Sequence, residues 1–322
     1  MKKIISVSRR TDIPAYYSNW FFNRIKDGYV GYVNPFGNQK YIVSLNPENI
    51  LCFVFWSKNF EPFIKILKYL KENDYLFYLH YTITGLPILF EKNTIDYKKS
   101  INIIKELSIM FDKSSIIWRY DPIIISSITD YYFHIEKFRE ISSSVKNYVE
   151  ICYISFTTYY DKVIRNYKEL QKNEKVNIIN PDIELRLKLA NELSIIANDN
   201  GIKIYSCCGD YLVGRNIQKG HCIDIKIIEK IILKNKKQDT KFLSPESELR
   251  KVKIKPTRQD CGCYESIDIG TYNTCPNGCL YCYANQNQEI SLKRYSNHND
   301  KSIFLGFPKE ISDLWINSAK KL

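Results

Sequence analysis

The chain has 322 residues, of which 44% are hydrophobic and 25% charged. This length and hydrophobic content are enough for a globular protein with a substantial core. No apolar run reaches the roughly 18 residues of a membrane helix and no signal peptide opens the chain, so we expect a cytoplasmic protein with no membrane contact. The net charge of +12 allows nucleic acid or another anion as a partner. The chain is also rich in the Lys, Ile, Asn and Tyr that AT-rich codons favour, which makes nucleic acid the weaker alternative.

Apolar segments with strand-like composition alternate with segments of helical periodicity through the first two thirds of the chain. The predicted strands are residues 4–8, 51–56, 75–82, 116–122, 150–156 and 202–206. The predicted helices are residues 17–26, 62–71, 94–111 with Thr94 as cap, 131–148 and 181–200, while 29–50 should form a loop or hairpin and 157–180 a helix followed by a loop. This alternation indicates a parallel sheet with right-handed crossovers.

Polar residues follow these predicted strands at their carboxyl ends, where α/β folds bind ligands. They are, in chain order, Arg9, Arg10 and Asp12, then Lys58, then His80, then Arg119 and Asp121, and finally Cys207 and Cys208. The alternative interpretation is a capping aspartate beside solvated arginines, with His80 a hydrogen-bonded core residue. No glycine-rich nucleotide loop follows the first strand, so we predict an α/β fold with a partial (β/α)6, TIM-like barrel over residues 1–240. Residues 241–322 are predicted to form a cysteine-rich iron-sulfur segment over the strand ends.

Near the end of the chain, Cys275, Cys279 and Cys282 have the spacing C-x3-C-x2-C. Three thiolates can bind three irons of a [4Fe-4S] cluster and leave the fourth iron open to a small molecule, whereas an electron carrier usually has four cysteine ligands. Pro276 stiffens this loop, and Gly278 allows the backbone to curl around a bulky cofactor. Three cysteines in a short loop can also bind zinc, which remains the alternative.

Five of the ten cysteines lie within 22 residues of a chain with no export signal, which favours metal or cluster ligation over disulfides. Four further thiolates come from separate segments and could complete a second, closed [4Fe-4S] cluster. They are Cys207, Cys222, Cys261 and Cys263, with Cys208 as the alternative to Cys207. A structural zinc site, with His221 as a substitute ligand, is the other interpretation of this second set.

Several segments resemble the bacterial family called domain of unknown function 1848. They are S-V-S-R-R-T-D-I-P at residues 6–14, F-W-S-K-N at 55–59, C-G-C at 261–263, D-I-G at 268–270 and Y-C-Y-A-N at 281–285. The family is uncharacterised, and its cysteines are noted as similar to the cluster loop of radical S-adenosylmethionine (SAM) enzymes. In those enzymes the open iron chelates SAM, and an electron from the cluster cleaves SAM to a 5′-deoxyadenosyl radical.

The chain also departs from the radical SAM pattern. The cysteine loop of those enzymes follows the first barrel strand, whereas here it lies beyond the sixth predicted strand. A Gly-Gly-Glu motif that would bind the SAM amino group is missing after the second strand, where W-S-K-N occupies residues 56–59. The resemblance therefore implies a rearranged relative or a convergent cluster protein.

Together, the residues and the resemblance predict a radical SAM-like iron-sulfur enzyme with SAM on the open iron and an anionic or polar substrate. A reductant such as ferredoxin or flavodoxin would supply the electron. The predicted cofactor-binding residues are Arg9, Arg10, Lys58, Arg119 and Tyr281, and the catalytic candidates are His80, Asp12 and Asp121. The alternatives are a non-radical iron-sulfur enzyme for dehydration or sulfur transfer, and a zinc-stapled protein that binds nucleic acid.

Overall fold

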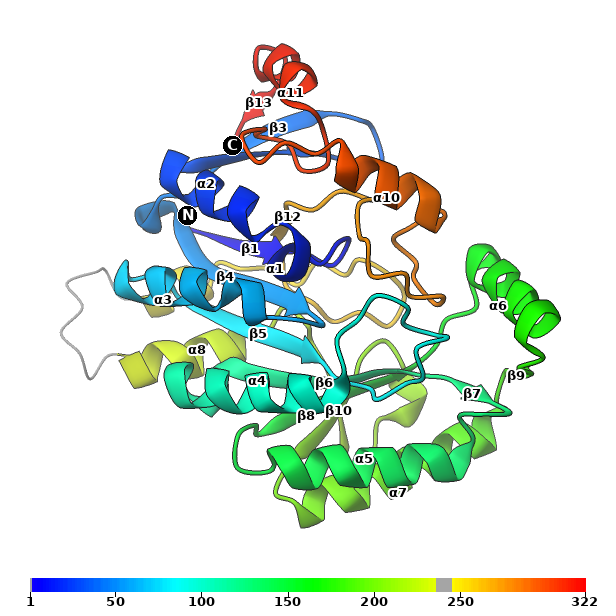
Figure 1. Ribbon diagram of the computed structural model, residues 1–322. Coiled ribbons are helices and arrows are strands. Elements are labelled where there is room, and N and C mark those ends of the chain that lie inside the picture. The colour runs from blue at the N-terminus through cyan, green and yellow to red at the C-terminus, as the bar shows by residue number, and fades with distance from the viewer. Residues whose placement is uncertain (1, 236–244) are drawn as a thin grey trace.

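The computed structural model describes residues 2–235 and 245–322, and its centre is one large parallel β-sheet (Figure 1). Within the described residues this sheet has eight strands in the order β11-β10-β8-β6-β5-β4-β1-β12. The strands are β1 (Lys3–Val7), β4 (Ile50–Ser57), β5 (Phe77–Thr82), β6 (Ile116–Ile123), β8 (Ile151–Phe156), β10 (Lys203–Ser206), β11 (Ile217–Lys219) and β12 (Ile267–Asp268). The predicted boundary between residues 240 and 241 lies outside the described residues.

All six predicted strands occur, but the predicted (β/α)6 barrel is wrong because the sheet is an open row. In a closed barrel the first and last predicted strands, β1 and β10, would pair with each other. Instead β1 pairs with β12 and β10 pairs with β11, and these two short strands form the edges of the sheet. Alternating strands and helices dictate parallel pairing in an open sheet and in a barrel alike, and polar residues collect at the carboxyl edge of both. The two edge strands are too short to give a sequence pattern.

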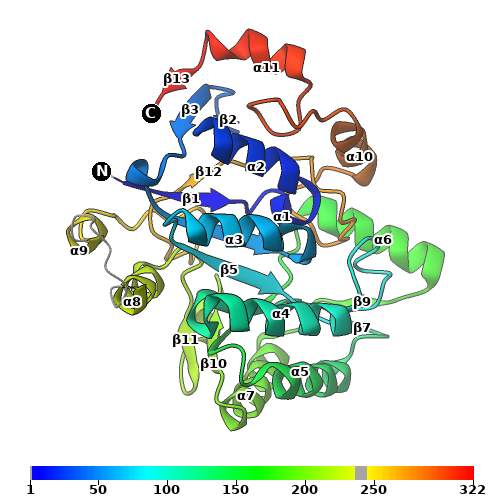
Figure 2. The same ribbon diagram turned by 60° about the vertical axis from the view of Figure 1, so that its left-hand side comes forward.

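Helices α2, α3, α4, α5 and α7 cover one face of the sheet (Figures 1 and 2). The helices are α1 (Ile13–Tyr16), α2 (Ser18–Asp27), α3 (Ile64–Glu72), α4 (Tyr97–Phe111), α5 (Tyr131–Val145), α6 (Asp161–Glu174), α7 (Ile183–Asp199), α8 (Ile225–Asn235), α9 (Pro245–Leu249), α10 (Gln288–Ser296) and α11 (Lys309–Ile316). Because side chains alternate along a strand, Phe53 and Phe55 enter this main core while Val54 faces the other side. That second face packs against α8 and against several cysteines.

The predicted helix at residues 94–111 begins later than expected. Asp96 caps α4 by accepting a hydrogen bond from the backbone N–H of Lys98, whereas the Thr94 hydroxyl donates to the carbonyl of Glu91. The prediction for α2 was accurate, since Gly28 ends this helix in the left-handed conformation.

The hairpin expected within residues 29–50 is part of a small second sheet. Its strands are β2 (Tyr29–Val33), β3 (Lys40–Ser44) and β13 (Lys320–Lys321), and a further small pair consists of β7 (Ile125–Ser126) and β9 (Ile178–Ile179). Phe304 packs directly on Gly31, where an added Cβ would lie 2.6 Å from the phenyl ring. The C-terminal residues therefore pack on the N-terminal hairpin, and both lie at the same end of the molecule in Figure 1.

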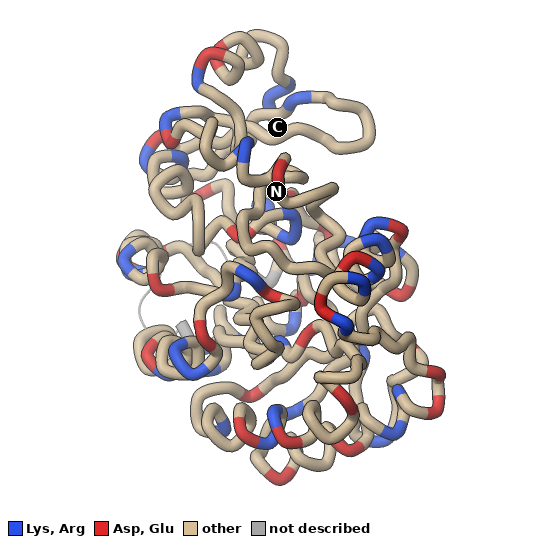
Figure 3. The backbone as a smooth tube through the Cα atoms, turned by 45° about the vertical axis from the view of Figure 1, so that its right-hand side comes forward, with Lys and Arg blue, Asp and Glu red and all other residues tan. Residues whose placement is uncertain are grey.

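Two global properties bear on the predicted partners. No helix in the described part of the chain is both long and apolar enough to cross a bilayer. Figure 3 shows Lys and Arg positions interspersed with Asp and Glu positions along the helices that this view displays. Binding of nucleic acid stays a prediction.

Candidate functional site

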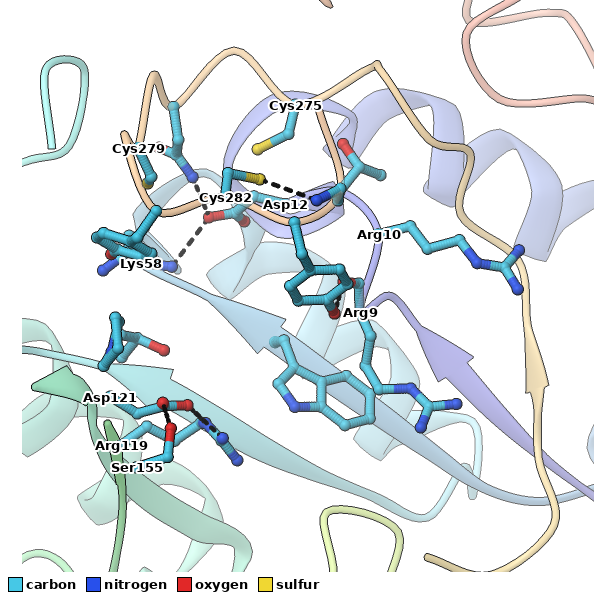
Figure 4. Close-up of a pocket in the computed structure, with 18 of the residues that line it drawn as sticks. Arg9, Arg10, Asp12, Lys58, Arg119, Asp121, Ser155, Cys275, Cys279 and Cys282 are labelled. Atoms are coloured by element: carbon cyan, nitrogen blue, oxygen red, sulfur yellow. Dashed lines mark hydrogen bonds and ion pairs between the residues drawn. The ribbon is translucent and has the colours of Figure 1, made fainter. Parts of the chain in front are cut away.

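A cavity of about 250 Å³ lies at the carboxyl edge of β1, β4, β5, β6 and β8, against the cysteine loop (residues 275–282) (Figure 4). Most of the residues predicted from sequence line it. They are Arg9, Arg10, Asp12, Lys58, Arg119, Asp121, Cys222, Cys275, Cys279, Tyr281 and Cys282. The structure therefore brings together the strand ends and a loop that lies more than 150 residues later in the chain than Asp121.

Asp12 joins three segments at this cavity. Its carboxylate caps α1 through Ala15 N (3.1 Å) and accepts hydrogen bonds from Ser57 Oγ (2.6 Å) and Lys58 N (2.9 Å) at the end of β4. Asn277 Nδ2 of the cysteine loop also donates to it, at 3.0 Å. Burial raises the pKa of Asp12, while these hydrogen bonds act in the opposite direction. With both oxygens occupied, Asp12 positions the loop and β4 relative to β1.

Glu91 is a second buried carboxylate at the loop, and the sequence analysis missed it. Its Oε1 accepts hydrogen bonds from Lys58 Nζ (2.8 Å), Thr84 Oγ1 (3.0 Å) and the hydroxyl of Tyr281. The backbone N–H of Leu280 also donates to the carbonyl of the preceding Phe90, at 3.0 Å. A single acidic residue in a connecting segment has no spacing that would mark it. Lys58 and Tyr281, both predicted to bind the cofactor, therefore share Glu91 as a hydrogen-bond acceptor.

The buried Arg119 and the partly exposed Asp121 form an ion pair on the opposite side of the cavity from the cysteine loop in Figure 4. The Nε of Arg119 lies 3.0 Å from Asp121 Oδ2, and its Nη1 lies 3.3 Å from the sulfur of Cys222. Ser155 Oγ donates to the other oxygen of Asp121. Burial alone would lower the pKa of Arg119. Asp121 and Cys222 outweigh burial, so the pKa of Arg119 stands well above the usual value and the charge is retained.

The two N-terminal arginines have different surroundings. Arg9 donates its backbone N–H to Asp268 of β12 at 2.9 Å, and its guanidinium lies 6.0 Å from the ring centroid of Trp56. Arg10 donates to the carbonyl of Gly270 at 3.2 Å and extends away from the three loop cysteines in Figure 4. The Arg9 guanidinium also points away from those cysteines in this view, toward Trp56 and Asp268.

His80 is fully buried and is not among the residues that line the cavity. Its ring stacks on Trp56 with a centroid distance of 4.9 Å, and its Nε2 lies 2.8 Å from the carbonyl of Cys222. Burial lowers the pKa of His80 to about 3, so the imidazole is neutral in ordinary buffers. Its catalytic role stays a prediction, and its location is that of a residue supporting the second set of cysteines.

The three loop cysteines lie at the cavity, and their ligation of a cluster stays a prediction. Cys275, Cys279 and Cys282 all line the cavity, and Gly278 has the left-handed φ of 68° that lets the loop turn. Burial raises the pKa of Cys275 to about 12, and Lys58 partly offsets the same effect at Cys279. In residues 2–235 and 245–322, no group of three or more His, Cys, Asp or Glu side chains is arranged to bind a single metal ion. In a cluster, by contrast, each thiolate binds its own iron.

The other predicted ligands also lie together, in what we call the second cysteine group. Its members are Cys207, Cys208, Cys222, Cys261 and Cys263. The sulfurs of Cys207 and Cys222 are 3.1 Å apart, and Cys208 lies within hydrogen-bonding range of Cys207 and Cys261. Residues from three distant segments therefore meet behind Arg119, and one of them, Cys222, reaches the cavity.

The model of a family described as Domain of unknown function (DUF1848) matches the chain over residues 4–284. The matched region contains all ten cysteines and every residue that lines the cavity. No curated protein matches the chain.

Proposed function

We propose that this chain, which belongs to the DUF1848 family, is an iron-sulfur enzyme whose cysteine loop binds a [4Fe-4S] cluster with SAM on the open iron. The observation that supports this proposal is that the loop thiols and five cationic side chains line one cavity. The cationic residues are Arg9, Arg10, Lys58, Arg119 and Arg258. Had the thiols and the arginines lined separate surfaces, the cysteines would have been better explained as a structural site.

The ligand set suits this cofactor. Cys275, Cys279 and Cys282, which all line the cavity, would bind three irons of the cluster and leave the fourth iron without a protein ligand. When bound, the cluster would supply the one electron needed for reductive cleavage of SAM, and so for abstraction of a hydrogen atom from the substrate. A reductant such as ferredoxin or flavodoxin would restore that electron.

The side chains of the cavity would bind and orient the ligands. Five cations outnumber the two lining carboxylates, Asp12 and Asp121, so the cavity favours an anionic ligand. Lys58 is paired with Glu91, Arg119 with Asp121 and Arg9, at 3.6 Å, with Asp268. Arg258, whose Nε contacts the sulfur of Cys208 rather than a carboxylate, is therefore the more available donor for a carboxylate or phosphate. Apolar contact from Trp56 and Tyr283 would exclude water from the reacting atoms.

The experiment is an assay of SAM cleavage. Protein purified under nitrogen should be brown, and with SAM and dithionite it should release 5′-deoxyadenosine. The matched control is the variant C275A/C279A/C282A, which should release none. Iron without SAM cleavage would overturn the radical assignment and favour the non-radical iron-sulfur alternative. Colourless protein with stoichiometric zinc would overturn the cluster itself.

A further inference from the structure

We propose that the second cysteine group binds a second [4Fe-4S] cluster that adjoins the same cavity. Its ligands are Cys207, Cys222, Cys261 and Cys263. The inference rests on the proposed function only in treating the cavity as the place where substrate binds. The site itself uses none of the loop cysteines.

The first argument is the convergence of buried, unpaired thiols. The four proposed ligands have between 3% and 7% of their surface exposed, and all are free cysteines. They come from the end of β10, from the turn before α8 and from the C-G-C segment. The thiol of Cys222 is within hydrogen-bonding range of Cys207 and Cys263, and Cys263 is within that range of Cys261. Four cysteine ligands with no open position are the usual ligation of a [4Fe-4S] cluster, and its binding would separate these neighbouring sulfurs onto four different irons.

The second argument is that donors from outside the group reach these sulfurs. Arg119 Nη1 donates to Cys222 at 3.3 Å, and the backbone N–H of Ile223 donates to Cys263 at 3.5 Å. The hydroxyl of Thr257 lies 3.6 Å from the sulfur of Cys261. Hydrogen bonds to the sulfurs are a principal means by which a protein sets the potential of a cluster. The buried charge of Arg119 would also offset the negative charge of a thiolate-ligated cluster.

Cys208 is the fifth thiol and is not assigned as a ligand. It is partly exposed, it adopts a left-handed φ of 54°, and its sulfur accepts a hydrogen bond from Arg258 Nε at 2.9 Å. Cys207, in contrast, is buried and lies 3.1 Å from Cys222. Because Cys207 is buried away from water and Cys208 is partly exposed, we assign Cys207 as the ligand.

The C-G-C segment requires glycine at its centre. A Cβ at Gly262 would lie 2.4 Å from the imidazole ring of His221, whose Nδ1 is 2.5 Å from the Gly262 carbonyl. His221 therefore positions the segment that carries Cys261 and Cys263 beside the segment that carries Cys222. This contact accounts for His221 without making it a metal ligand.

The position of Cys222 gives the second cluster access to the cavity. Cys222 and Arg119 both line it, and Arg119 links Cys222 to Asp121. An anion bound beside Arg119 would draw its guanidinium away from the sulfur or compete for its charge. The electronic state of the second cluster should therefore respond to what occupies the cavity.

Iron and sulfide analysis of C275A/C279A/C282A tests the site, because this variant keeps the second group intact. We expect about four iron and four sulfide atoms per chain and an electron paramagnetic resonance signal after reduction. The control C208S should leave the iron content of the full chain at about eight, whereas C261S/C263S should lower it to about four. If the loop variant does not fold, C261S/C263S decides the question alone.

The outcomes separate this inference from the proposed function. A loop variant that contains zinc or no iron, or a C261S/C263S variant that keeps all its iron, overturns the second cluster even if the full chain cleaves SAM. A loop variant with four irons supports it even if the full chain releases no 5′-deoxyadenosine. The link to the cavity is tested by R119K, which should shift the midpoint potential of the second cluster. An unchanged potential overturns that link.

Discussion

The hydroxyl of Tyr281 donates a hydrogen bond to the buried carboxylate of Glu91. These residues are 190 positions apart, and the same carboxylate is paired with Lys58. The cysteine loop is therefore attached to the strand ends through a charged group that belongs to neither set of cysteines. Its removal should disturb the loop without changing any proposed ligand.

Replacing Glu91 by alanine should destabilise the protein strongly. Lys58 and Glu91 have only 12% and 8% of their side-chain surface exposed, so E91A leaves a buried charge without its partner. We expect the free energy of unfolding to fall by roughly 3 to 5 kcal/mol in denaturant titrations. The matched control is E61A, whose partner Lys99 is 52% exposed; it should change the free energy by less than about 1 kcal/mol. Equal effects of the two variants would contradict the role given to Glu91.

Asp268 should make stability depend on acid pH. Burial alone would raise the pKa of Asp268. The charges of Arg10 and Arg9 and the hydrogen bonds to the carboxylate together outweigh burial, so the folded pKa lies below the usual 3.8. Its contribution is then fully present above pH 3.8 and is lost as the pH falls through the folded pKa. The variant D268N should be less stable than the native chain at pH 7, and the difference should shrink on acidification. Unfolding measured from pH 6 to pH 2 would show a constant difference if this explanation were wrong.

A second pH effect should come from His134. It is 1% exposed, Tyr120 and the carbonyl of Ile124 contact its two ring nitrogens, and burial lowers its pKa to about 4. Between the usual 6.5 and about 4 the unfolded chain binds a proton that the folded chain does not, so stability falls as the pH is lowered. One proton corresponds to a slope of at most about 1.4 kcal/mol per pH unit. H134Q should reduce the slope of stability against pH over that range. An unchanged slope would contradict the role given to His134.

The packing of the C-terminal segment can be tested at glycine. An added Cβ at Gly31 would meet the Phe304 ring at 2.6 Å, so G31A should lower stability by about 1 to 3 kcal/mol. Gly37, in the same hairpin, has nothing within 4 Å of an added Cβ. G37A should therefore stay within about 0.5 kcal/mol of the native chain in thermal unfolding. Similar melting temperatures for both variants would mean that Phe304 does not pack on β2 in solution.

The sequence predicted the body of the sheet because its strands are long apolar runs. Val54 and Phe55 face opposite sides of β4 and are both buried, which makes the whole segment apolar and easy to recognise. It also identified the polar residues at the strand ends, since each follows such a run directly. Closure into a barrel was a wrong inference, because it depends on edge pairing by segments as short as Ile267–Asp268, which carry no periodicity.

The candidate site was predictable wherever the residue type itself is informative. Closely spaced cysteines indicate metal or cluster ligation whatever the fold around them. Glu91 and Asp268 could not be found in this way, because their importance comes from burial beside Lys58 and Arg9, respectively. Burial of that kind depends on contacts between distant segments, which spacing along the chain does not encode.

The pairing of β1 with β12 also has a consequence for synthesis on the ribosome. The outer edge of β1 is completed by residues 267 and 268, which are synthesised more than 250 residues after it. Until then a nascent chain presents unpaired backbone groups of β1, which can recruit a neighbouring polypeptide. Chains that terminate before residues 267 and 268 should accordingly aggregate.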